Sequence, residues 1–306
     1  MIISASRRTD IPAFYTDWFM ERIRAGYCTV PNPYNPRQVS HVSLRPADVD
    51  VIVLWTRHPL PLMRYLTELD DLGYRYYFQY TLLGYPRLLE PRRPTLERSI
   101  EVFRKLAGRV GPARVIWRYD PIILSALTNV EYHEEIFGRI ARSLQGYTQR
   151  CVLSFVDEYV KTRVRLRALE AHGLDITYRG DGMLDGDTAQ IAQSIAEMCS
   201  RYDIAPASCA ESPGLERYGI SPGKCVDDVY IRSTFGIDVS GRKDPAQRAA
   251  CGCVISKDIG TYGTCLFGCK YCYATGDFER ARRNYARRDP TAVALAHADR
   301  RREGER

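Results

Sequence analysis

The chain has 306 residues, of which 45% are hydrophobic and 26% are charged, and its formal net charge is +7. The length allows one large domain or two modest ones, and the charged fraction is ordinary for a globular protein. No apolar run approaches the roughly 18 residues that a membrane helix needs, and no long apolar segment follows the first basic residues as in a secretory signal. We therefore expect a cytoplasmic protein that does not span a membrane.

Short β-rich segments alternate with helical periods from the N-terminus to about residue 210. The predicted strands are residues 2–6, 49–55, 74–82, 113–117, 150–156 and 205–210. The predicted helices are residues 14–26, 60–73, 94–108, 130–144, 160–173 and 188–202. Apolar strands that alternate with amphipathic helices are typical of a parallel sheet covered by helices. With about six to eight such units in one domain, we predict a (β/α) barrel of the TIM type, complete or partial.

Two segments interrupt the alternation. Residues 28–45 contain several Pro and Asn residues around a β-like VSHVSL, and they predict a loop or hairpin inserted after the first helix. Residues 211–250 are rich in Gly, Pro and Asp, which is typical of a long functional loop region. We therefore divide the chain into a barrel body (1–210), a Cys-rich region that closes the barrel (211–279) and a basic helix and tail (280–306).

Charged residues follow several of the predicted strands. Arg7 and Asp10 follow the first strand, and Arg118 and Asp120 follow the fourth. Because the C-terminal strand ends carry the chemistry in (β/α) barrels, we predict that these four residues are catalytic and position a substrate. Structural roles remain open, since Asp10 would also cap a helix that has Pro12 in its first turn, and Arg118 with Asp120 would form an ion pair.

The positive charge is concentrated at the end of the chain, because residues 280–306 contain nine arginines and four acidic residues. One interpretation is a solvated helix and tail. The other is an electrostatic contact with an anionic substrate or a nucleic acid.

Seven of the ten cysteines lie within residues 209–272. Of the other three, Cys28, Cys151 and Cys199, the last two are predicted to be small core residues. Structural disulfides are rare in the cytoplasm, so the concentration of thiols indicates metal binding. The five histidines show no ligand spacing, and His133 is predicted to lie on a helix surface.

Cys265, Cys269 and Cys272 form a C-x3-C-x2-C motif, with the aromatic Tyr271 just before the last cysteine. Three thiolates on one tight loop could hold three irons of a [4Fe–4S] cluster and leave the fourth iron without a protein ligand. That iron could chelate a molecule through an amino and a carboxylate group, and S-adenosylmethionine carries both groups.

The other four clustered cysteines suggest a candidate second site. Cys209, Cys225, Cys251 and Cys253 could together ligate a second [4Fe–4S] cluster or a zinc ion. Three alternatives remain: a zinc site shared by Cys251, Cys253 and the C-x2-C half of the C-terminal motif, a fourth ligand for the first cluster, and free core thiols.

The C-x3-C-x2-C motif resembles that of radical S-adenosylmethionine enzymes, a superfamily that uses a full or partial (β/α) barrel. The chain as a whole resembles the bacterial domain-of-unknown-function 1848 family. The segments that carry this second resemblance are SASRRTDIPAFY, VPNPYNP, VIVLWTRHP, YYFQYTLLGY, VIWRYDPIIL, LSFVDEY, SCAES, GKCVD and CGCVISKDIGTYGTCLFGCKYCYA. The resemblance implies a C-terminal cysteine cluster of the radical S-adenosylmethionine kind and supplies no substrate.

The chain departs from the superfamily pattern in two ways. The cysteine motif usually follows the first strand but comes last here, which a circularly permuted barrel would explain if residues 254–258 closed against residues 2–6. The second departure is that the methionine amino group has only one weak glycine-rich candidate site, Gly180-Asp181-Gly182.

Two functions from different classes follow. The first is an enzyme that takes an electron from a donor such as flavodoxin or ferredoxin, cleaves S-adenosylmethionine reductively and starts radical chemistry on an unknown small molecule. The second is a binding protein stabilised by zinc or iron, with nucleic acid as a candidate ligand and without catalysis.

Overall fold

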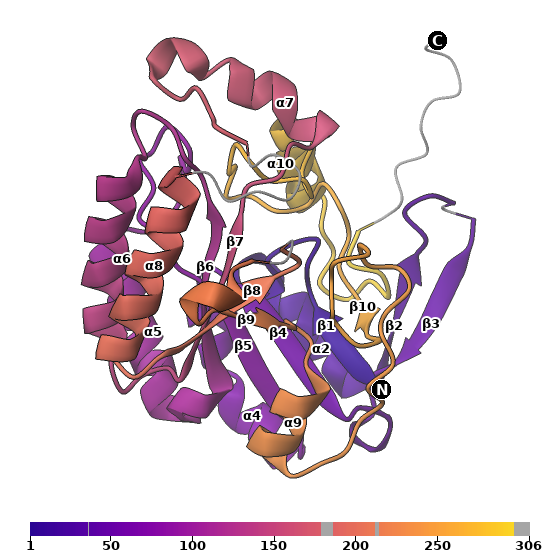
Figure 1. Ribbon diagram of the computed structural model, residues 1–306. Helices are drawn as coiled ribbons and strands as arrows, with labels where there is room; N and C mark the ends of the chain where they lie inside the picture. Colours follow the sequence, from indigo (N-terminus) through magenta and orange to yellow (C-terminus); the bar gives the residue numbers. More distant parts are fainter. Residues whose placement is uncertain (36, 179–185, 212–213, 297–306) are drawn as a thin grey trace.

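The computed structural model describes residues 1–35, 37–178, 186–211 and 214–296 (Figure 1). The strands of its main sheet are β1 (Ile2–Ala5), β4 (Val51–Thr56), β5 (Tyr76–Thr81), β6 (Val115–Ile122), β7 (Arg150–Phe155), β8 (Ala205–Cys209), β9 (Ser221–Gly223) and β10 (Lys257–Asp258). They form an eight-stranded sheet in the order β10-β1-β4-β5-β6-β7-β8-β9, and every neighbouring pair is parallel. The predicted parallel α/β architecture is therefore confirmed.

Helices connect the strands. The α-helices are α1 (Ile11–Phe14), α2 (Thr16–Ala25), α3 (Leu60–Met63), α4 (Leu66–Asp71), α5 (Leu96–Val110), α6 (Val130–Leu144), α7 (Val160–Arg167), α8 (Gly186–Arg201), α9 (Asp228–Phe235) and α10 (Phe278–Ala286). Short 3-10 turns occupy Pro46–Asp48, Pro112–Arg114, Glu170–His172 and Glu216–Tyr218. Within the described ranges, none of the helices combines the length and the apolar character needed to cross a bilayer.

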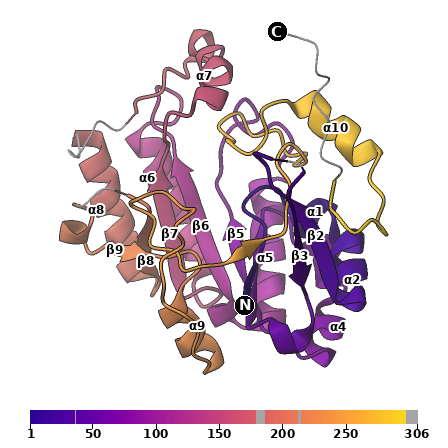
Figure 2. The same ribbon diagram turned by 90° about the vertical axis from the view of Figure 1, so that its right-hand side faces the viewer.

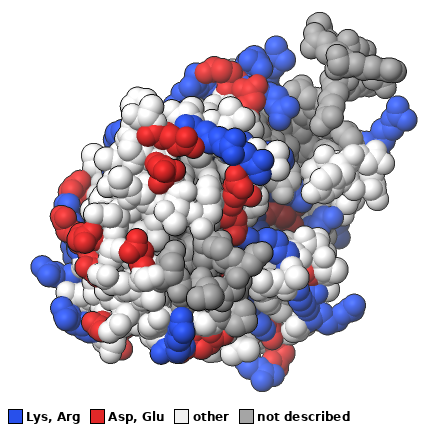
Figure 3. Space-filling model, turned by 45° about the horizontal axis from the view of Figure 1, so that its top comes forward, with Lys and Arg blue, Asp and Glu red and all other residues white. Residues whose placement is uncertain are grey.

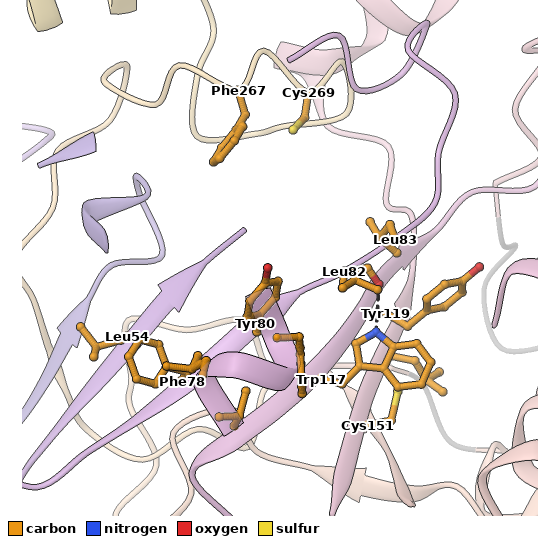
Figure 4. Packing of buried hydrophobic residues seen from close by; sticks show 14 of the residues in the cluster. Leu54, Phe78, Tyr80, Leu82, Leu83, Trp117, Tyr119, Cys151, Phe267 and Cys269 are labelled. Carbon is orange, nitrogen blue, oxygen red and sulfur yellow. Dashed lines mark hydrogen bonds between the residues drawn. The ribbon is translucent and has the colours of Figure 1, made fainter. Parts of the chain in front are cut away.

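Side-chain alternation along the strands creates two separate cores. On one face, Leu54, Phe78 and Trp117 belong to the core beneath the connecting helices (Figure 4). On the other face, Val53 and Tyr77 pack with residues from 225–254 and with α9. The loop region after β9 therefore covers the face of the sheet that the other helices leave open (Figure 2).

The sequence order of the outer strands bears on the predicted permutation. β10 pairs with β1 in parallel, with Ile3 opposite Lys257 and Ser4 opposite Asp258. The predicted pairing of residues 254–258 with the first strand is therefore confirmed, although only two of those residues form the strand. Among the described residues, β9 and β10 lie at opposite ends of the pairing order. The pairings therefore show a parallel sheet and do not show that it closes into a barrel.

The predicted hairpin is also confirmed, as β2 (Tyr27–Pro31) pairs antiparallel with β3 (Val39–Ser43). The end of the described chain packs beside it. The backbone N–H of Thr29 donates to the carbonyl of Val293 (2.8 Å), and the indole N–H of Trp18 donates to the carbonyl of Ala292 (2.9 Å). Residues from both ends of the chain thus build one side of the molecule.

Candidate metal centres

The C-x3-C-x2-C motif lies in an irregular segment between β10 and α10, called here the three-cysteine loop (residues 259–277). The loop packs over α1 and the carboxyl ends of the strands, where Phe267 and Cys269 lie above Tyr80 of β5 (Figure 4). The hydroxyl of Tyr15 donates to the carbonyl of Thr264 (2.8 Å). These contacts place the motif outside the carboxyl edge of a parallel sheet, where α/β proteins bind their ligands.

The three thiols of the loop are close enough to interact electrostatically. Cys269 is buried, and Cys265 and Cys272 are half-buried. Burial raises the pKa of Cys265 well above its ordinary value, and the neighbouring thiols of Cys272 and Cys269 raise it further. Burial also raises the pKa of Cys269, to about 12, although the guanidinium of Arg57 opposes this shift. The thiols of Cys265 and Cys269 are therefore protonated at neutral pH, whereas a bound metal ion would deprotonate them.

A buried ion pair supports the three-cysteine loop from below. Nη1 of Arg57 lies 2.7 Å from Oε1 of Glu90, which is completely buried. The hydroxyl of Tyr271 donates to the Glu90 carboxylate and accepts a hydrogen bond from the Arg57 guanidinium. Burial alone would lower the pKa of Arg57, but the Glu90 carboxylate holds it well above its ordinary value. Tyr271, predicted to bind a cofactor, thus uses its hydroxyl to connect the loop to this pair.

Sequence reasoning did not single out Arg57 and Glu90. Arg57 directly follows β4, so the charge at that strand end was a usable signal. Glu90 lies in an irregular segment before α5, among arginines and prolines, where an acidic residue normally faces solvent.

Asp10 lies on the same side of the site. It caps a helix, which was one of the two roles predicted for it. Its carboxylate caps α1 by accepting from the backbone N–H of Ala13 (2.9 Å), and it also accepts from the backbone N–H of Arg57 (2.7 Å). Burial raises the pKa of Asp10 to about 7, although both hydrogen bonds oppose the shift. The carboxyl group is close enough to Cys265 to influence it electrostatically.

The other four clustered cysteines form a second group, called here the thiol row (Cys209, Cys225, Cys251 and Cys253). The Sγ atoms of Cys209 and Cys225 are 3.2 Å apart, and the sulfur of Cys253 accepts from the backbone N–H groups of Cys225 (3.3 Å) and Val226 (3.4 Å). Cys251 continues the row through a hydrogen bond to Cys253. The hydrogen bond from Cys225 lowers the pKa of Cys209 to about 7, and hydrogen bonds from Cys225 and Cys251 lower that of Cys253.

Neither group of thiols is preformed around an ion. In the parts of the chain that the structure describes, no set of three or more His, Cys, Asp or Glu side chains is arranged as metal ligands in its present positions. The side chains would have to adjust their rotamers on binding, which is common where the site itself forms with the metal.

Two predicted catalytic arginines lie beside the thiol row and close to the indole ring of Trp55. The guanidinium carbon of Arg118 is 4.9 Å from the centre of the Trp55 ring, and that of Arg7 is 5.1 Å away. Nη1 of Arg118 donates to the sulfur of Cys225 (2.8 Å), and Nη2 forms the predicted ion pair with Asp120. The structure thus brings Arg7, Arg118 and Asp120 together and places Asp10 at the other group of thiols. A role for the four in positioning substrate stays a prediction.

The prediction that His133 lies on a helix surface is wrong. The ring is 1% exposed, with Nδ1 accepting from the hydroxyl of Tyr119 (2.8 Å) and Nε2–H donating to the carbonyl of Ile123 (2.9 Å). His133 shares the buried face of α6 with Phe137 and Ile140, at the helical spacing of four and seven residues. The acidic neighbours on both sides of His133 obscured this periodicity.

Two arginines of the basic helix at the end of the chain have acidic neighbours. On α10, Arg282 pairs with Glu279 and Arg283 lies 4.0 Å from Asp277. The view onto the top of the molecule shows basic and acidic side chains interspersed (Figure 3). The nucleic-acid interpretation stays a prediction. Residues 297–306 and the candidate Gly180-Asp181-Gly182 lie outside the described residues.

Comparison with known protein families gave a match over most of the chain. A family model with the description "Domain of unknown function (DUF1848)" covers residues 2–274, which include both groups of thiols. The resemblance inferred from the sequence segments is therefore confirmed. No curated protein and no solved structure matches the chain.

Proposed function

The chain belongs to the DUF1848 family, whose description assigns no activity, and we propose that it is an iron–sulfur enzyme that resembles radical S-adenosylmethionine enzymes. The main support is that one loop brings Cys265, Cys269 and Cys272 within electrostatic range of one another at the carboxyl edge of a parallel sheet. We also propose that the sheet belongs to a permuted (β/α) barrel, in which β10 and the loop after it take the place of the usual first strand and its loop.

The donor set of the three-cysteine loop fits a [4Fe–4S] cluster. Three thiolates on one loop would ligate three irons and leave one iron for S-adenosylmethionine. When bound, such a cluster supplies an electron for cleavage of a C–S bond of S-adenosylmethionine, and so for radical chemistry on a small molecule, with flavodoxin or ferredoxin as the class of donor.

The chain's own residues would hold and shield this site. Phe267 is 5% exposed, and its ring centre is 4.7 Å from that of Phe14, so this pair excludes water from one side of the loop. The guanidinium of Arg57 favours the thiolate form of Cys269, which is the ligating form. Nη2 of Arg165 donates to the carbonyl of Cys272 (2.6 Å) and so ties α7 to the motif.

The proposal is tested on the full chain purified without oxygen. We expect about four iron and four sulfide ions bound by the motif, and a change in the visible spectrum when S-adenosylmethionine is added. Changing Cys265, Cys269 or Cys272 singly to Ala should abolish the spectral change and lower the iron content, whereas Cys28→Ala, at a buried thiol far from the motif in the sequence, should change neither.

Two results would contradict the proposal. If all three single variants kept the iron of the wild type, the ligands would be elsewhere. If the folded wild-type protein held zinc and no iron, the second function, a metal-stabilised binding protein without catalysis, would be favoured instead.

A further inference from the structure

We propose that the thiol row binds one zinc ion, in a four-thiolate site that is separate from the three-cysteine loop and holds residues 225–254 against the face of the sheet that carries Val53 and Tyr77. The row draws its ligands from three places in the fold. Cys209 ends β8, Cys225 lies between β9 and α9, and Cys251 and Cys253 precede β10. The fold brings these three places into contact, because Cys225 lies against both Cys209 and Cys253.

The compactness of the row favours a single ion. With Zn–S bonds of about 2.3 Å, the sulfurs around tetrahedral zinc lie about 3.8 Å apart. The Sγ atoms of Cys209 and Cys225 are already 3.2 Å apart, so a small rotation of each side chain would open the site. A four-iron cluster would place an inorganic core between the sulfurs and require a wider separation.

The hydrogen bonds around the row suit thiolates better than thiols. The sulfur of Cys253 accepts from two backbone N–H groups at 3.3 and 3.4 Å, and the sulfur of Cys225 accepts from Arg118 at 2.8 Å. Arginine donates only and cannot lose its charge, and a neutral thiol is a weak acceptor for it. Donors that converge on sulfur in this way are the usual outer contacts of metal-bound cysteine.

The charges beside the row match the proposed site as well. Four thiolates and one Zn²⁺ carry a net charge of −2. The guanidinium of Arg118, which is 7% exposed, and that of Arg7 both interact electrostatically with thiols of the row. Positive charge beside a buried anionic site offsets the unfavourable burial of its charge.

A structural role follows from what the row connects. The carbonyl of Cys225 accepts from the hydroxyl of Tyr77 and from Nε2 of Gln79, both at 2.8 Å, so the row is attached to the centre of the sheet. The segment it secures, residues 225–254, covers a whole face of the sheet and contains only one α-helix, α9. A closed zinc site contributes its binding free energy directly to the folding of such a segment.

The test uses the full chain carrying Cys265→Ala, Cys269→Ala and Cys272→Ala together, which removes the first site. We expect about one zinc per chain, no iron, and a lower unfolding midpoint after zinc is removed with a chelator. Cobalt substituted for zinc should give the visible absorption of a tetrahedral four-thiolate site. Adding Cys209→Ser, at the least buried ligand, should lower the zinc content, whereas adding Cys199→Ser, at a buried thiol of α8, should not.

Each other outcome overturns the proposal. A folded triple variant without zinc or iron would make the row a set of free thiols, and one with about four iron and four sulfide ions would make it a second cluster. Zinc that survives Cys209→Ser unchanged would contradict the ligand assignment. Should the triple variant fail to fold, the zinc content of the wild type is compared with that of Cys209→Ser alone. This comparison also decides whether the thiol row binds zinc. Zinc is counted apart from iron, so the failure of this proposal is distinguishable from the failure of the iron–sulfur proposal.

Discussion

Two buried polar residues of this chain, His133 and Asp10, show how burial changes the chemistry of a side chain. His133 is held between a tyrosine hydroxyl and a backbone carbonyl, so its neutral form with the proton on Nε2 satisfies both contacts. Burial lowers its pKa to about 4. Asp10 shows the opposite shift, because burial disfavours its charged form.

The buried imidazole of His133 should make the free energy of unfolding depend on pH. In the unfolded chain it takes up a proton below about pH 6.5, but in the folded chain only near pH 4. The contribution of the neutral His133 ring to the free energy of unfolding is therefore fully present above pH 6.5 and is lost as the pH falls toward 4. The loss is roughly 2 kcal/mol between about pH 7 and pH 5. In chemical denaturation at these two pH values, His133→Gln should show a smaller difference than the wild type.

A suitable control is His172→Gln, because His172 is exposed. This variant should keep the pH dependence of the wild type. If His133→Gln kept it as well, the buried imidazole would not be its source.

At the scale of elements, the site depends on irregular segments that ordered strands hold in place. The three-cysteine loop contacts the segment before α5, where the backbone N–H of Lys270 donates to the carbonyl of Leu89 (3.0 Å), and it is joined to β4 through Arg57 and Glu90. Loops positioned by a rigid scaffold commonly carry function.

Changing Glu90 to Gln should loosen this arrangement. It would leave the Arg57 guanidinium buried without its anionic partner, which lowers the free energy of unfolding by about 3–5 kcal/mol. We also expect faster loss of iron from the loop, because Tyr271 loses the carboxylate that accepts a hydrogen bond from its hydroxyl group. Denaturation curves and the rate of iron release to a chelator measure the two effects.

Glu97→Gln is the matched control. Glu97 pairs with Arg139 across a surface where both side chains are at least half exposed, so its loss should leave the free energy of unfolding nearly unchanged. Equal effects of the two changes would show that the buried pair does not support the loop.

Gly260 should tolerate no side chain. A Cβ there would lie 2.6 Å from Cβ of Ser6, whose hydroxyl donates to Asp258 (2.7 Å) and is therefore not free to move. We expect Gly260→Ala to lower the free energy of unfolding by about 1–3 kcal/mol. Gly108→Ala, in α5 with no atom within 4 Å of the new Cβ, should instead raise it by up to about 1 kcal/mol. Thermal unfolding of both variants distinguishes them, and equal shifts would refute the steric explanation.

Local periodicity was sufficient to predict the elements but not their partners. The alternation of apolar residues located β4, β5 and β7, and the amphipathic period located α5 and α6, because both depend on neighbours in the sequence. Glu90 could not be assigned to Arg57 in this way, since their contact depends on how a loop and a strand end meet in three dimensions. The thiol row was predicted as one of several groupings, and the contacts of Cys225 with Cys209 and Cys253 depend on loops whose meeting no local pattern indicates.

At the scale of the whole molecule, the N- and C-terminal parts of the chain stabilise each other. Residues 291–293 accept hydrogen bonds from α2 and β2, and Leu295 is 4% exposed in the same core as Trp18. The C-terminal part of the chain was expected to be a solvated tail, and residues 290–296 of the described chain are instead partly packed. Weak periodicity after Pro290 gave no signal for this contact.

Leu295→Ala should therefore destabilise the protein by about 2–5 kcal/mol, as is usual for a buried leucine. Val293→Ala is the control, because this side chain is 43% exposed and only its backbone carbonyl is used, and we expect a change within about 0.5 kcal/mol. Chemical denaturation of both variants measures the difference. Similar values for the two would mean that the C-terminal segment contributes nothing to stability.

The pairing of β1 with β10 also sets the order of events during synthesis. Ser4 and Asp258 are 254 residues apart, so β1 leaves the ribosome on the order of 10–50 s before the strand that covers its edge. An uncovered edge strand is a template for wrong pairing, so this edge of β1 is open to wrong pairing in that interval. Both groups of thiols are completed only by residues close to or beyond β10, so the proposed metal sites would be loaded late in the synthesis of this chain.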